Sequence, residues 1–554
     1  MLDRGVQIER LHREAFDIVV IGGGITGAAA ARDAARRGYR TALLEARDFA
    51  EGTSSRSSRL IHGGLRYLEQ FEFDLVFEAS QERRTLLEIA PHLVRPLEFL
   101  FPIYESGQVG KLKLDAGMWL YDALSLFRNI ERHQMLDADE VLEREPGLLG
   151  EGLLGGARYF DAQVDDARLV LTTVAGAVAA GAAAANRLEV VEVLADHGGK
   201  KGPVATGVKV RDEDGEEWPI WAPAVLNATG PWADITLERA GTHDPPLIRP
   251  TRGSHIHVSR RKLPHQSALI LESSVDGRIM FVLPWGDLTM IGTTDDFYEG
   301  PPEDVVPTAG DVTYLLESAN ALFPEADLGI DDVLSAWAGL RPLVVEEGSA
   351  EGAVSREFLI REDPRGLFTI AGGKLTSHRS MAEELIDQAR DYLKKEHDIK
   401  ARRRRSDTES VPLPGGDFES LDDLCAALRP EAERRGLSAQ TADWLARAHG
   451  TRYHPVLELI DANPALADPI VDDRPYILAD VAFAASSEMA VHAEDVLYRR
   501  THVGLETREF EVACRRVVEV MAETLGWDAD RSDTETARAN AIRAANRAYR
   551  GEVQ

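Results

Sequence analysis

Three glycines and one acid near the amino end have the types and spacing to bind a dinucleotide. Gly22, Gly24 and Gly27 directly follow the apolar run 18–21, and Glu45 ends a second apolar run. In such a turn one glycine permits the tight bend, one lets a pyrophosphate approach the backbone, and one lets helix pack on strand. The acid is placed to accept hydrogen bonds from a ribose. The pattern predicts that an adenine dinucleotide binds here, without saying which one, and an ordinary glycine-rich turn between strand and helix is the alternative.

A second glycine turn lies far along the chain. Residues 367–376 predict a strand that enters a turn at Gly372-Gly373, followed by Lys374 and a helix. The start of that helix could face the other end of the same cofactor. Two positive helix ends suit a flavin, because its pyrimidine edge gains negative charge on reduction, whereas a nicotinamide would need only one. A third turn, at 227–232, also follows a strand, and each later turn could instead be an ordinary surface turn.

Several basic side chains stand beside glycine turns or similar special backbone. In a chain of net charge −30, a local group of cations would bind a small dianion such as a phosphate monoester. Arginine forks and a lysine point charge are the usual means. Taken singly, each arginine is more simply explained by a surface salt bridge. The candidates are Arg66 and Tyr67 after Gly63-Gly64, with Arg341, Arg356 and Lys374.

Two histidines are candidates for a general base. Oxidation of an alcohol by hydride transfer requires loss of the hydroxyl proton, and a neutral histidine is the natural acceptor. His62 lies in a glycine turn near the cofactor segment, and His255 follows Gly253-Ser254. His255 and His257 share a face of a predicted strand, but no third ligand has recognisable spacing, so we predict no metal site. Either candidate base could instead be a structural histidine.

Size and composition limit the classes of protein to which the chain can belong. Its 554 residues are too many for one core, so we expect two to four domains. The two cysteines, Cys425 and Cys514, cannot form a disulfide framework, which indicates a reducing compartment. We expect neither a signal peptide nor a transmembrane helix. The net charge of −30 argues against nucleic acid as a partner.

The elements that must position these residues alternate between strand and helix over most of the chain. Alanine-rich helices are predicted over 28–37 and 169–185, and short alternating strands follow the second of them. Composition shifts at 394–405, beyond which the pattern is mostly helical. We therefore predict a domain boundary near residue 400.

Two basic stretches could contact a membrane. Lys111–Arg128 is amphipathic, with basic ends and an interior of Met, Trp, Leu and Phe; it could be a core helix or could dip into a lipid interface. Arg402–Arg405 could be a solvated linker or could touch anionic lipid. Both alternatives stay open from sequence alone.

With these residues in place, the chain resembles the FAD-dependent glycerol-3-phosphate dehydrogenases of aerobic respiration. The resemblance runs from about Phe16 to Arg379 and is weaker in the helical tail. The glycine fingerprint is common to many flavoproteins, whereas the segments His62–Tyr67 and Val164–Leu169 are far more specific. The other segments that carry it are 21–27, 53–55, 227–232, 253–255, 291–295, 339–343 and 372–376.

The resemblance implies an α/β fold. It implies an FAD-binding Rossmann domain of the glutathione-reductase type (about 16–100, 150–240 and 350–400). This domain would be interleaved, within 16–400, with a mixed β-sheet substrate domain (about 100–150 and 240–350). A helical carboxy-terminal domain would follow at 405–554.

The resemblance also implies a reaction, oxidation of sn-glycerol 3-phosphate to dihydroxyacetone phosphate with hydride passing from C2 to the flavin N5. Arg66, Tyr67, Arg341, Arg356 and Lys374 match positions that hold the substrate, and Arg341 would also steady the developing oxyanion. His62 and His255 remain the two candidate bases. The residues expected to contact FAD are Gly22, Gly24, Thr26, Gly27, Glu45, Thr53, Ser54, Ser55, His62, Gly63, Gly64, Thr229, Gly230, Gly372, Gly373, Lys374, Leu375 and Thr376.

The electron acceptor and the cellular location follow from the same resemblance. Electrons would pass to a membrane quinone, and the protein would lie in the cytoplasm as a peripheral protein on the cytoplasmic face of the membrane, with a homodimer as a candidate assembly. An oxidase that passes electrons to oxygen shares every motif. An amine or amino-acid oxidase would need a carboxylate clamp, and a non-enzymatic flavin-binding protein would have no use for the arginines.

Overall fold

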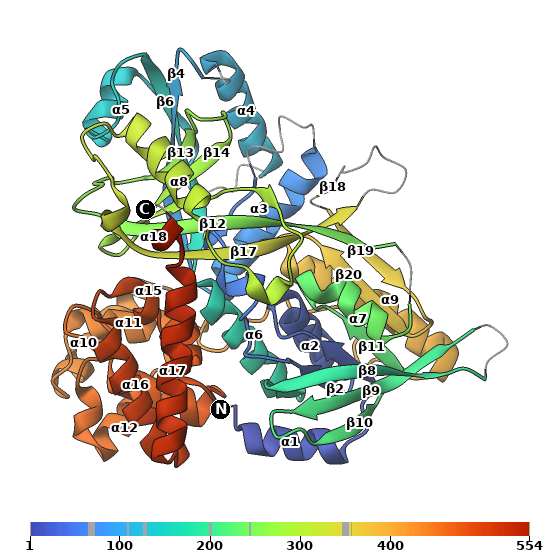
Figure 1. Ribbon diagram of the computed structural model, residues 1–554. Helices are drawn as coiled ribbons and strands as arrows, with labels where there is room; N and C mark the ends of the chain where they lie inside the picture. Colours follow the sequence, from blue (N-terminus) through green and yellow to red (C-terminus); the bar gives the residue numbers. More distant parts are fainter. Residues whose placement is uncertain are drawn as a thin grey trace.

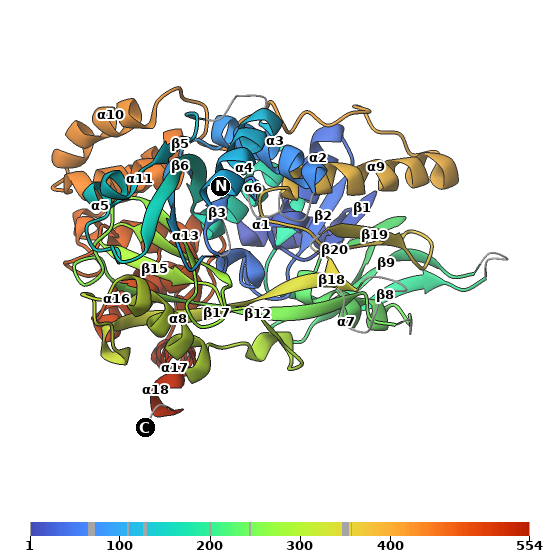
Figure 2. The ribbon, with the colours of Figure 1, turned by 90° about the horizontal axis from the view of Figure 1, so that it is seen from above.

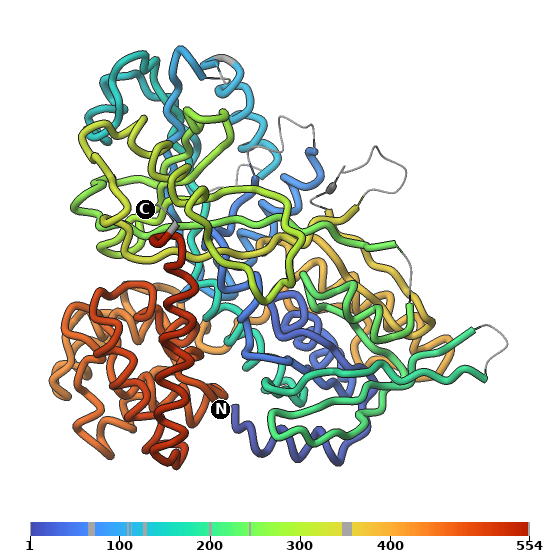
Figure 3. The backbone as a smooth tube through the Cα atoms, in the orientation of Figure 1, coloured from blue at the N-terminus to red at the C-terminus, as the bar shows by residue number. Residues whose placement is uncertain are grey.

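The computed structural model describes residues 2–64, 72–107, 110–125, 130–198, 202–242, 245–345, 354–355 and 357–552. Three units are visible in Figure 1: a parallel sheet covered by helices, a long twisted sheet crossing beside it, and a group of carboxy-terminal helices. Figure 3 traces the same path as a tube, in which the red and orange carboxy-terminal segments form one group to the side of the rest of the chain.

The first unit is a six-stranded sheet in the order β19-β20-β11-β1-β2-β7. Its strands β20, β11, β1, β2 and β7 are mutually parallel, and β19 is antiparallel to β20. The bounds are β1 (Ile18–Ile21), β2 (Thr41–Leu44), β7 (Ala183–Ala185), β11 (Ala224–Asn227), β19 (Phe358–Glu362) and β20 (Leu367–Gly372). Strands β1, β2, β7 and β11 are buried along their whole length, as continuous apolar runs in a parallel sheet require.

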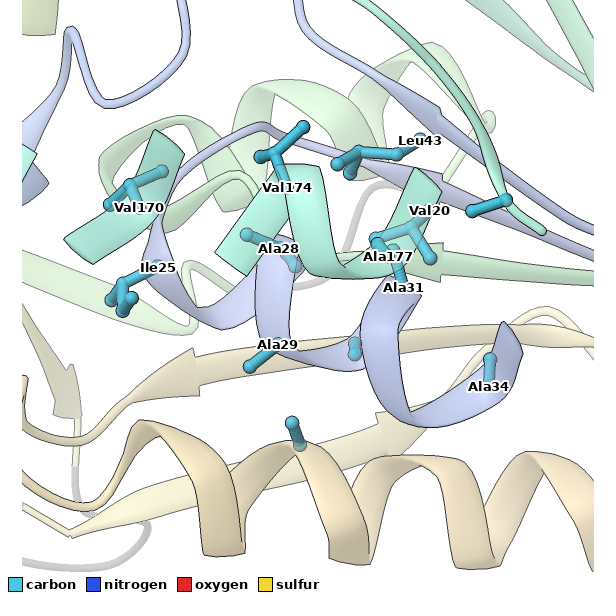
Figure 4. Close-up of a cluster of buried hydrophobic side chains, with 14 of the residues drawn as sticks. Val20, Ile25, Ala28, Ala29, Ala31, Ala34, Leu43, Val170, Val174 and Ala177 are labelled. Carbon is cyan, nitrogen blue, oxygen red and sulfur yellow. The ribbon is translucent and has the colours of Figure 1, made fainter. Parts of the chain in front are cut away.

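Three helices pack together on this sheet. Helix α2 (Ile25–Arg37) contacts both α6 (Asp166–Ala179) and α9 (His378–His397). Figure 4 shows Ala28 of α2 close to Val174 of α6, and Ala31 close to Val20 of β1. Small side chains let helix axes approach closely, which explains the alanine-rich composition of α2. In Figure 2, α2 and α9 run side by side over the sheet.

The predicted helix over 169–185 is wrong at its carboxyl end. Helix α6 ends at Ala179, Gly181 takes a φ of +109°, and Ala183–Ala185 form the edge strand β7 paired with β2. Alanine favours a helix locally, but pairing with β2 buries these three residues and decides their conformation. The predicted strands that follow are present as a three-stranded antiparallel sheet of β8 (Leu188–Asp196), β9 (Val204–Asp212) and β10 (Glu217–Trp221).

The second unit is a mixed eleven-stranded sheet whose main path is β18-β17-β12-β15-β14-β13-β4-β6-β3. It is mostly antiparallel, with β13 parallel to β4. The helices α3 (Phe73–Ile89), α4 (Lys111–Leu124), α5 (Ala138–Arg144), α7 (Ala233–Arg239) and α8 (Ala309–Leu322) accompany the two sheets. The strands are β3 (Leu60–Ile61), β4 (Val94–Tyr104), β5 (Gln134–Leu136), β6 (Leu153–Val164), β12 (Ile248–Ser259), β13 (Ala268–Glu272), β14 (Ile279–Trp285), β15 (Leu288–Gly292), β16 (Asp296–Phe297), β17 (Val333–Val345) and β18 (Val354–Ser355).

The third unit consists of helices. They are α10 (Leu421–Glu433), α11 (Ala439–His449), α12 (His454–Ala462), α13 (Leu478–Ser487), α14 (Ala493–Asp495), a π-helical turn (Val496–Arg500), α15 (Val503–Glu506), α16 (Phe510–Leu525), α17 (Ala529–Asn546) and α18 (Tyr549–Glu552). At the amino end, α1 (Arg4–Arg13) packs beside β7. Segments of the two large sheets alternate along the chain, and the helical unit follows them. This arrangement is the predicted fold class. The exact domain limits stay a prediction.

Candidate active site

One cavity of about 940 Å³ lies where the two large sheets meet. The carboxyl ends of β1, β2, β11 and β20 open into it, and β12 and β17 of the mixed sheet form its other wall. Ligands bind at this end of the strands in open α/β sheets. The predicted residues that line it are Gly22, Gly24, Thr26, Glu45, Thr53, Ser54, His62, Gly64, Thr229, Gly230, His255, Arg341, Gly372, Gly373, Lys374 and Leu375.

Four other predicted residues lie just behind this lining. Gly27 packs on Gly22, where a side chain would overlap the Gly22 carbonyl. Gly63 donates its N–H to Tyr121 and Asp161, and Thr376 bonds the backbone of His62 through its hydroxyl. Ser55 ends the short helical turn Thr53–Ser55. Arg66, Tyr67 and Arg356 lie outside the residues that the structure describes.

The amino-terminal turn has the geometry of a phosphate cradle. Gly22 adopts a φ of +107°, and a Cβ there would lie 2.6 Å from the carbonyl oxygen of Ala228. The Glu45 carboxylate accepts the N–H groups of Gly23 (2.6 Å) and Arg47 (2.7 Å). Burial raises the pKa of Glu45 to about 7. A tight turn at the start of α2 and a sheltered carboxylate therefore face one cavity, as the sequence pattern predicts.

The second turn reaches the same cavity from β20. Gly372 and Gly373 have φ values of +79° and +81°, and a side chain on Gly373 would overlap Met381 of α9. Lys374 and Leu375 follow directly, and both line the cavity. The two turns, about 350 residues apart in the chain, thus line one cavity, as expected if both bind the same ligand.

Arg341 is held in a fixed orientation on the mixed sheet. Its guanidinium donates to Asp295 (3.0 Å), to the Thr293 hydroxyl (2.8 Å) and to the Thr294 carbonyl (3.1 Å). It lies over Gly253 of the neighbouring strand, where any side chain would overlap it. The glycine in the Gly253-Ser254-His255 segment therefore provides the space that this arginine needs.

His255 is a buried wall of the cavity. Its Nε2 is hydrogen-bonded to the Ser58 hydroxyl at 2.8 Å, and its ring stacks on Trp337 with centroids 5.4 Å apart. Burial, with Arg341 and Arg59 nearby, lowers the pKa of His255 to about 3. His257 points to a different environment, close to the Leu505 carbonyl of α15. His62 lines the cavity and is half-buried.

Comparison with known proteins gives the family. Residues 17–388 match the family model of FAD dependent oxidoreductases, and residues 406–532 match the C-terminal domain of alpha-glycerophosphate oxidase. The aerobic glycerol-3-phosphate dehydrogenase of Bacillus subtilis is 35% identical over 98% of this chain and 97% of its own. The glycerol-3-phosphate dehydrogenase of Mycobacterium leprae is 38% identical over 97% of this chain and 90% of its own. The chain belongs to the FAD-dependent glycerol-3-phosphate dehydrogenase family.

A solved structure of this family has the same fold. The glycerol-3-phosphate dehydrogenase from Bacillus halodurans, complexed with FAD, covers 98% of both chains with a TM-score of 0.81 and 29% identity. An L-alpha-glycerophosphate oxidase from Mycoplasma pneumoniae shares the fold at a TM-score of 0.57 and 18% identity, over 72% of this chain. The predictions of FAD as cofactor and of a glutathione-reductase-type fold are confirmed.

The site of this dehydrogenase-family chain fits FAD. At Gly22, Gly372 and Gly373 a Cβ would collide with neighbouring protein atoms, so only glycine allows these tight turns, and both turns line the same cavity. Gly22, Gly24 and the start of α2 would hold the pyrophosphate, Glu45 the ribose, and the Gly372-Gly373 turn the flavin end.

Sequence reasoning missed two features of the site. Ser58 and Asp295 fix His255 and Arg341; their signals were the hydroxyl-rich segment 53–59 and the Thr-Thr-Asp segment that ends at 295. The second feature is an apolar wall of Phe99, Phe101, Ile270, Phe281 and Leu120. These residues come from strands of ordinary core composition and helix α4, so nothing local marks them.

Proposed function

We propose that the chain oxidises sn-glycerol 3-phosphate to dihydroxyacetone phosphate. The observation that carries the proposal is the position of Arg341 and Lys374 in the cavity that holds both glycine turns. A fixed guanidinium and an ammonium are suited to a phosphate monoester, and names of close relatives specify this substrate. FAD, when bound, supplies the hydride acceptor at N5.

Arg341 is assigned to substrate orientation and to stabilisation of negative charge on the reacting oxygen. Its hydrogen bonds to Asp295, Thr293 and Thr294 fix it before substrate binds, so little reorganisation is needed in the transition state. Arg66, Tyr67 and Arg356 complete the phosphate pocket in the proposal, on the family resemblance alone.

His62 is the better of the two candidate proton acceptors. A general base works best when its pKa is near the working pH, and the lowered pKa of His255, about 3, makes that histidine a weak base. His62 is half-buried on the cavity wall. The Thr376 hydroxyl accepts from the backbone N–H of His62 and donates to its backbone carbonyl, which holds this segment in place. We therefore assign proton acceptance to His62 and a positioning role, beside Ser58, to His255.

A membrane quinone is the proposed electron acceptor, and oxygen is the alternative. The apolar wall gives the cavity a surface suited to a lipophilic ring. Leu120 and Lys113 of α4 line the cavity, whereas Trp119, which is 52% exposed, and the exposed Lys111 do not. One helix thus connects the cavity with an outer surface that carries an aromatic ring and a cation, which supports a peripheral contact with an anionic membrane. Among the described residues, no helix is long and apolar enough to cross a membrane.

The experiment that tests the reaction uses the purified FAD-loaded protein without oxygen. Addition of sn-glycerol 3-phosphate should bleach the flavin absorbance, and absence of bleaching would refute the proposed substrate. Rates are then compared with a soluble quinone analogue and with oxygen. Rapid peroxide formation, at a rate that matches turnover, would favour the oxidase.

The membrane contact is tested with a matched pair of exposed tryptophans. Trp119→Ser should reduce co-sedimentation with vesicles that contain anionic lipid, whereas Trp221→Ser, at a residue 56% exposed on β10, should not. Equal behaviour of the two variants would exclude α4 as the contact.

A further inference from the structure

The loop after Glu45 is anchored by the carboxy-terminal helices. Asp48 is fully buried, and Arg500 forms a fork with its carboxylate, Nη1 to Oδ2 at 2.5 Å and Nη2 to Oδ1 at 2.8 Å. Arg499 adds a bond from Nε to Oδ2 at 2.6 Å. Both arginines belong to the π-helical turn 496–500, about 450 residues further along the chain. Burial would raise the pKa of Asp48, but Arg500 and Arg499 hold it below its usual value.

The anchored loop is a wall of the cofactor cavity. Residues 45–47 and 51–53 line the cavity on either side of Asp48. Ala50 donates its N–H to the Gly23 carbonyl, and Arg47 donates its N–H to Glu45. A displacement of Asp48 therefore moves both the ribose-binding acid and the phosphate turn.

A second group of buried charges holds Arg499 in place. Asp495 accepts from Arg499 at 2.5 Å and from Arg187 at 2.6 Å, and the N–H of Arg187 donates to the Arg47 carbonyl. Asp48, Arg187, Asp495, Arg499 and Arg500 are each at most 5% exposed. Because a buried ion is costly once its partner is lost, this network tolerates little change in geometry.

We propose that the carboxy-terminal helices complete the FAD site from outside: Arg499 and Arg500 are positioning residues that hold the loop 45–53 through Asp48. The affinity for FAD then depends on how the carboxy-terminal helices dock, although none of their described residues lines the cavity. Coupling between sites is reciprocal, so FAD in turn stabilises the docked arrangement.

The test compares two arginine forks of the same kind. Arg168 forms a buried fork with the Glu488 carboxylate, at 2.8 Å for both bonds, between α6 and the carboxy-terminal helices but away from the cavity. Arg500 also contacts Glu488, but at its backbone carbonyl, which Arg168→Lys does not remove. Arg500→Lys and Arg168→Lys each keep the charge and lose the fork. Apoprotein of each variant is titrated with FAD by flavin fluorescence, and the release of FAD from the folded holoprotein is timed.

Arg500→Lys should raise the dissociation constant for FAD by roughly 5- to 150-fold, the usual range of coupling between sites. Arg168→Lys should leave it within about threefold. The rise in melting temperature on adding FAD should also shrink for Arg500→Lys alone. Unchanged affinity in a cooperatively folded Arg500→Lys, or equal weakening in both variants, would overturn the proposal. Should Arg500→Lys fail to fold, Arg499→Lys is measured against the same control.

Discussion

Substitution of Arg341, by Lys in one variant and by Met in another, is the sharpest test of the proposed chemistry, and the Met variant carries the numerical prediction. The lysine keeps a positive charge but loses the planar fork that reaches Asp295, Thr293 and Thr294 together. Arg341→Met removes the charge as well and leaves Asp295 without this ion pair. Neither change touches the glycine turns, so FAD should remain bound.

The expected loss follows from the charge. A unit charge 4 Å from another contributes about 4 kcal/mol at an effective dielectric constant near 20. Asp295 neutralises part of the charge of Arg341, since the pair is 3.0 Å apart, so the estimate falls to about 3 kcal/mol. With 1.36 kcal/mol for each factor of ten, Arg341→Met should lower kcat/KM by roughly 10²-fold to 10³-fold.

The assay is anaerobic reduction of the flavin by sn-glycerol 3-phosphate, followed in a stopped-flow spectrometer. Arg252→Met is the matched control, because Arg252 lies on β12 beside Gly253 and pairs with Asp311 outside the cavity lining. Folded Arg252→Met protein should reduce its flavin at nearly the rate of the unmodified enzyme. A rate in Arg341→Met within about threefold of the unmodified enzyme would refute the role of Arg341.

Three further predictions follow. Gly253→Ala should displace the Arg341 guanidinium and lower kcat/KM about tenfold with FAD content unchanged, checked by flavin absorbance and kinetics; full activity would contradict the packing argument. His62→Gln should slow flavin reduction by roughly 10²- to 10⁴-fold and remove an ionisation from its pH profile; a profile that keeps it would exclude His62 as base. Burial would lower the pKa of His492, but its hydrogen bonds to Glu213 and Glu535 raise it to about 9. The resulting stability is complete below about pH 6.5 and is lost as pH rises through about 9, so His492→Gln should lower the melting temperature at pH 6 and much less at pH 10.

The parts of the site that the sequence could predict are those encoded by short segments. Gly22, Gly24 and Glu45 can be predicted because they lie in one continuous strand–turn–helix–strand segment, whose geometry depends on residues close in the sequence. The Gly372-Gly373 turn is readable for the same reason. Arg341 is different: its role came from the family resemblance, because its partner Asp295 is 46 residues distant and Gly253 is further still.

The predicted helix was wrong where pairing with another strand, rather than local helix preference, decides the conformation. Ala183–Ala185 continue an alanine-rich helix by composition, yet they pair with β2 as the buried edge of the parallel sheet. A helix there would leave the edge of β2 uncovered and would expose three alanines that the sheet buries. The sequence carries the correct signal only in Gly181, whose positive φ ends the helix.

The buried ion pairs between the carboxy-terminal helices and the rest of the molecule have the same long-range origin. Asp48 stands in a loop and Arg499-Arg500 in a helical turn, and charged residues of these types are mostly exposed in proteins, so neither segment alone predicts a buried ion pair. Two apolar faces could dock in several registers, whereas the Arg500 fork accepts a carboxylate in one geometry. Buried charge is expensive in any other register, because an unpaired ion would remain. These ion pairs therefore determine where the helical unit docks. Because Asp48 lies three residues after Glu45, the same ion pairs also hold the ribose end of the cofactor site in place.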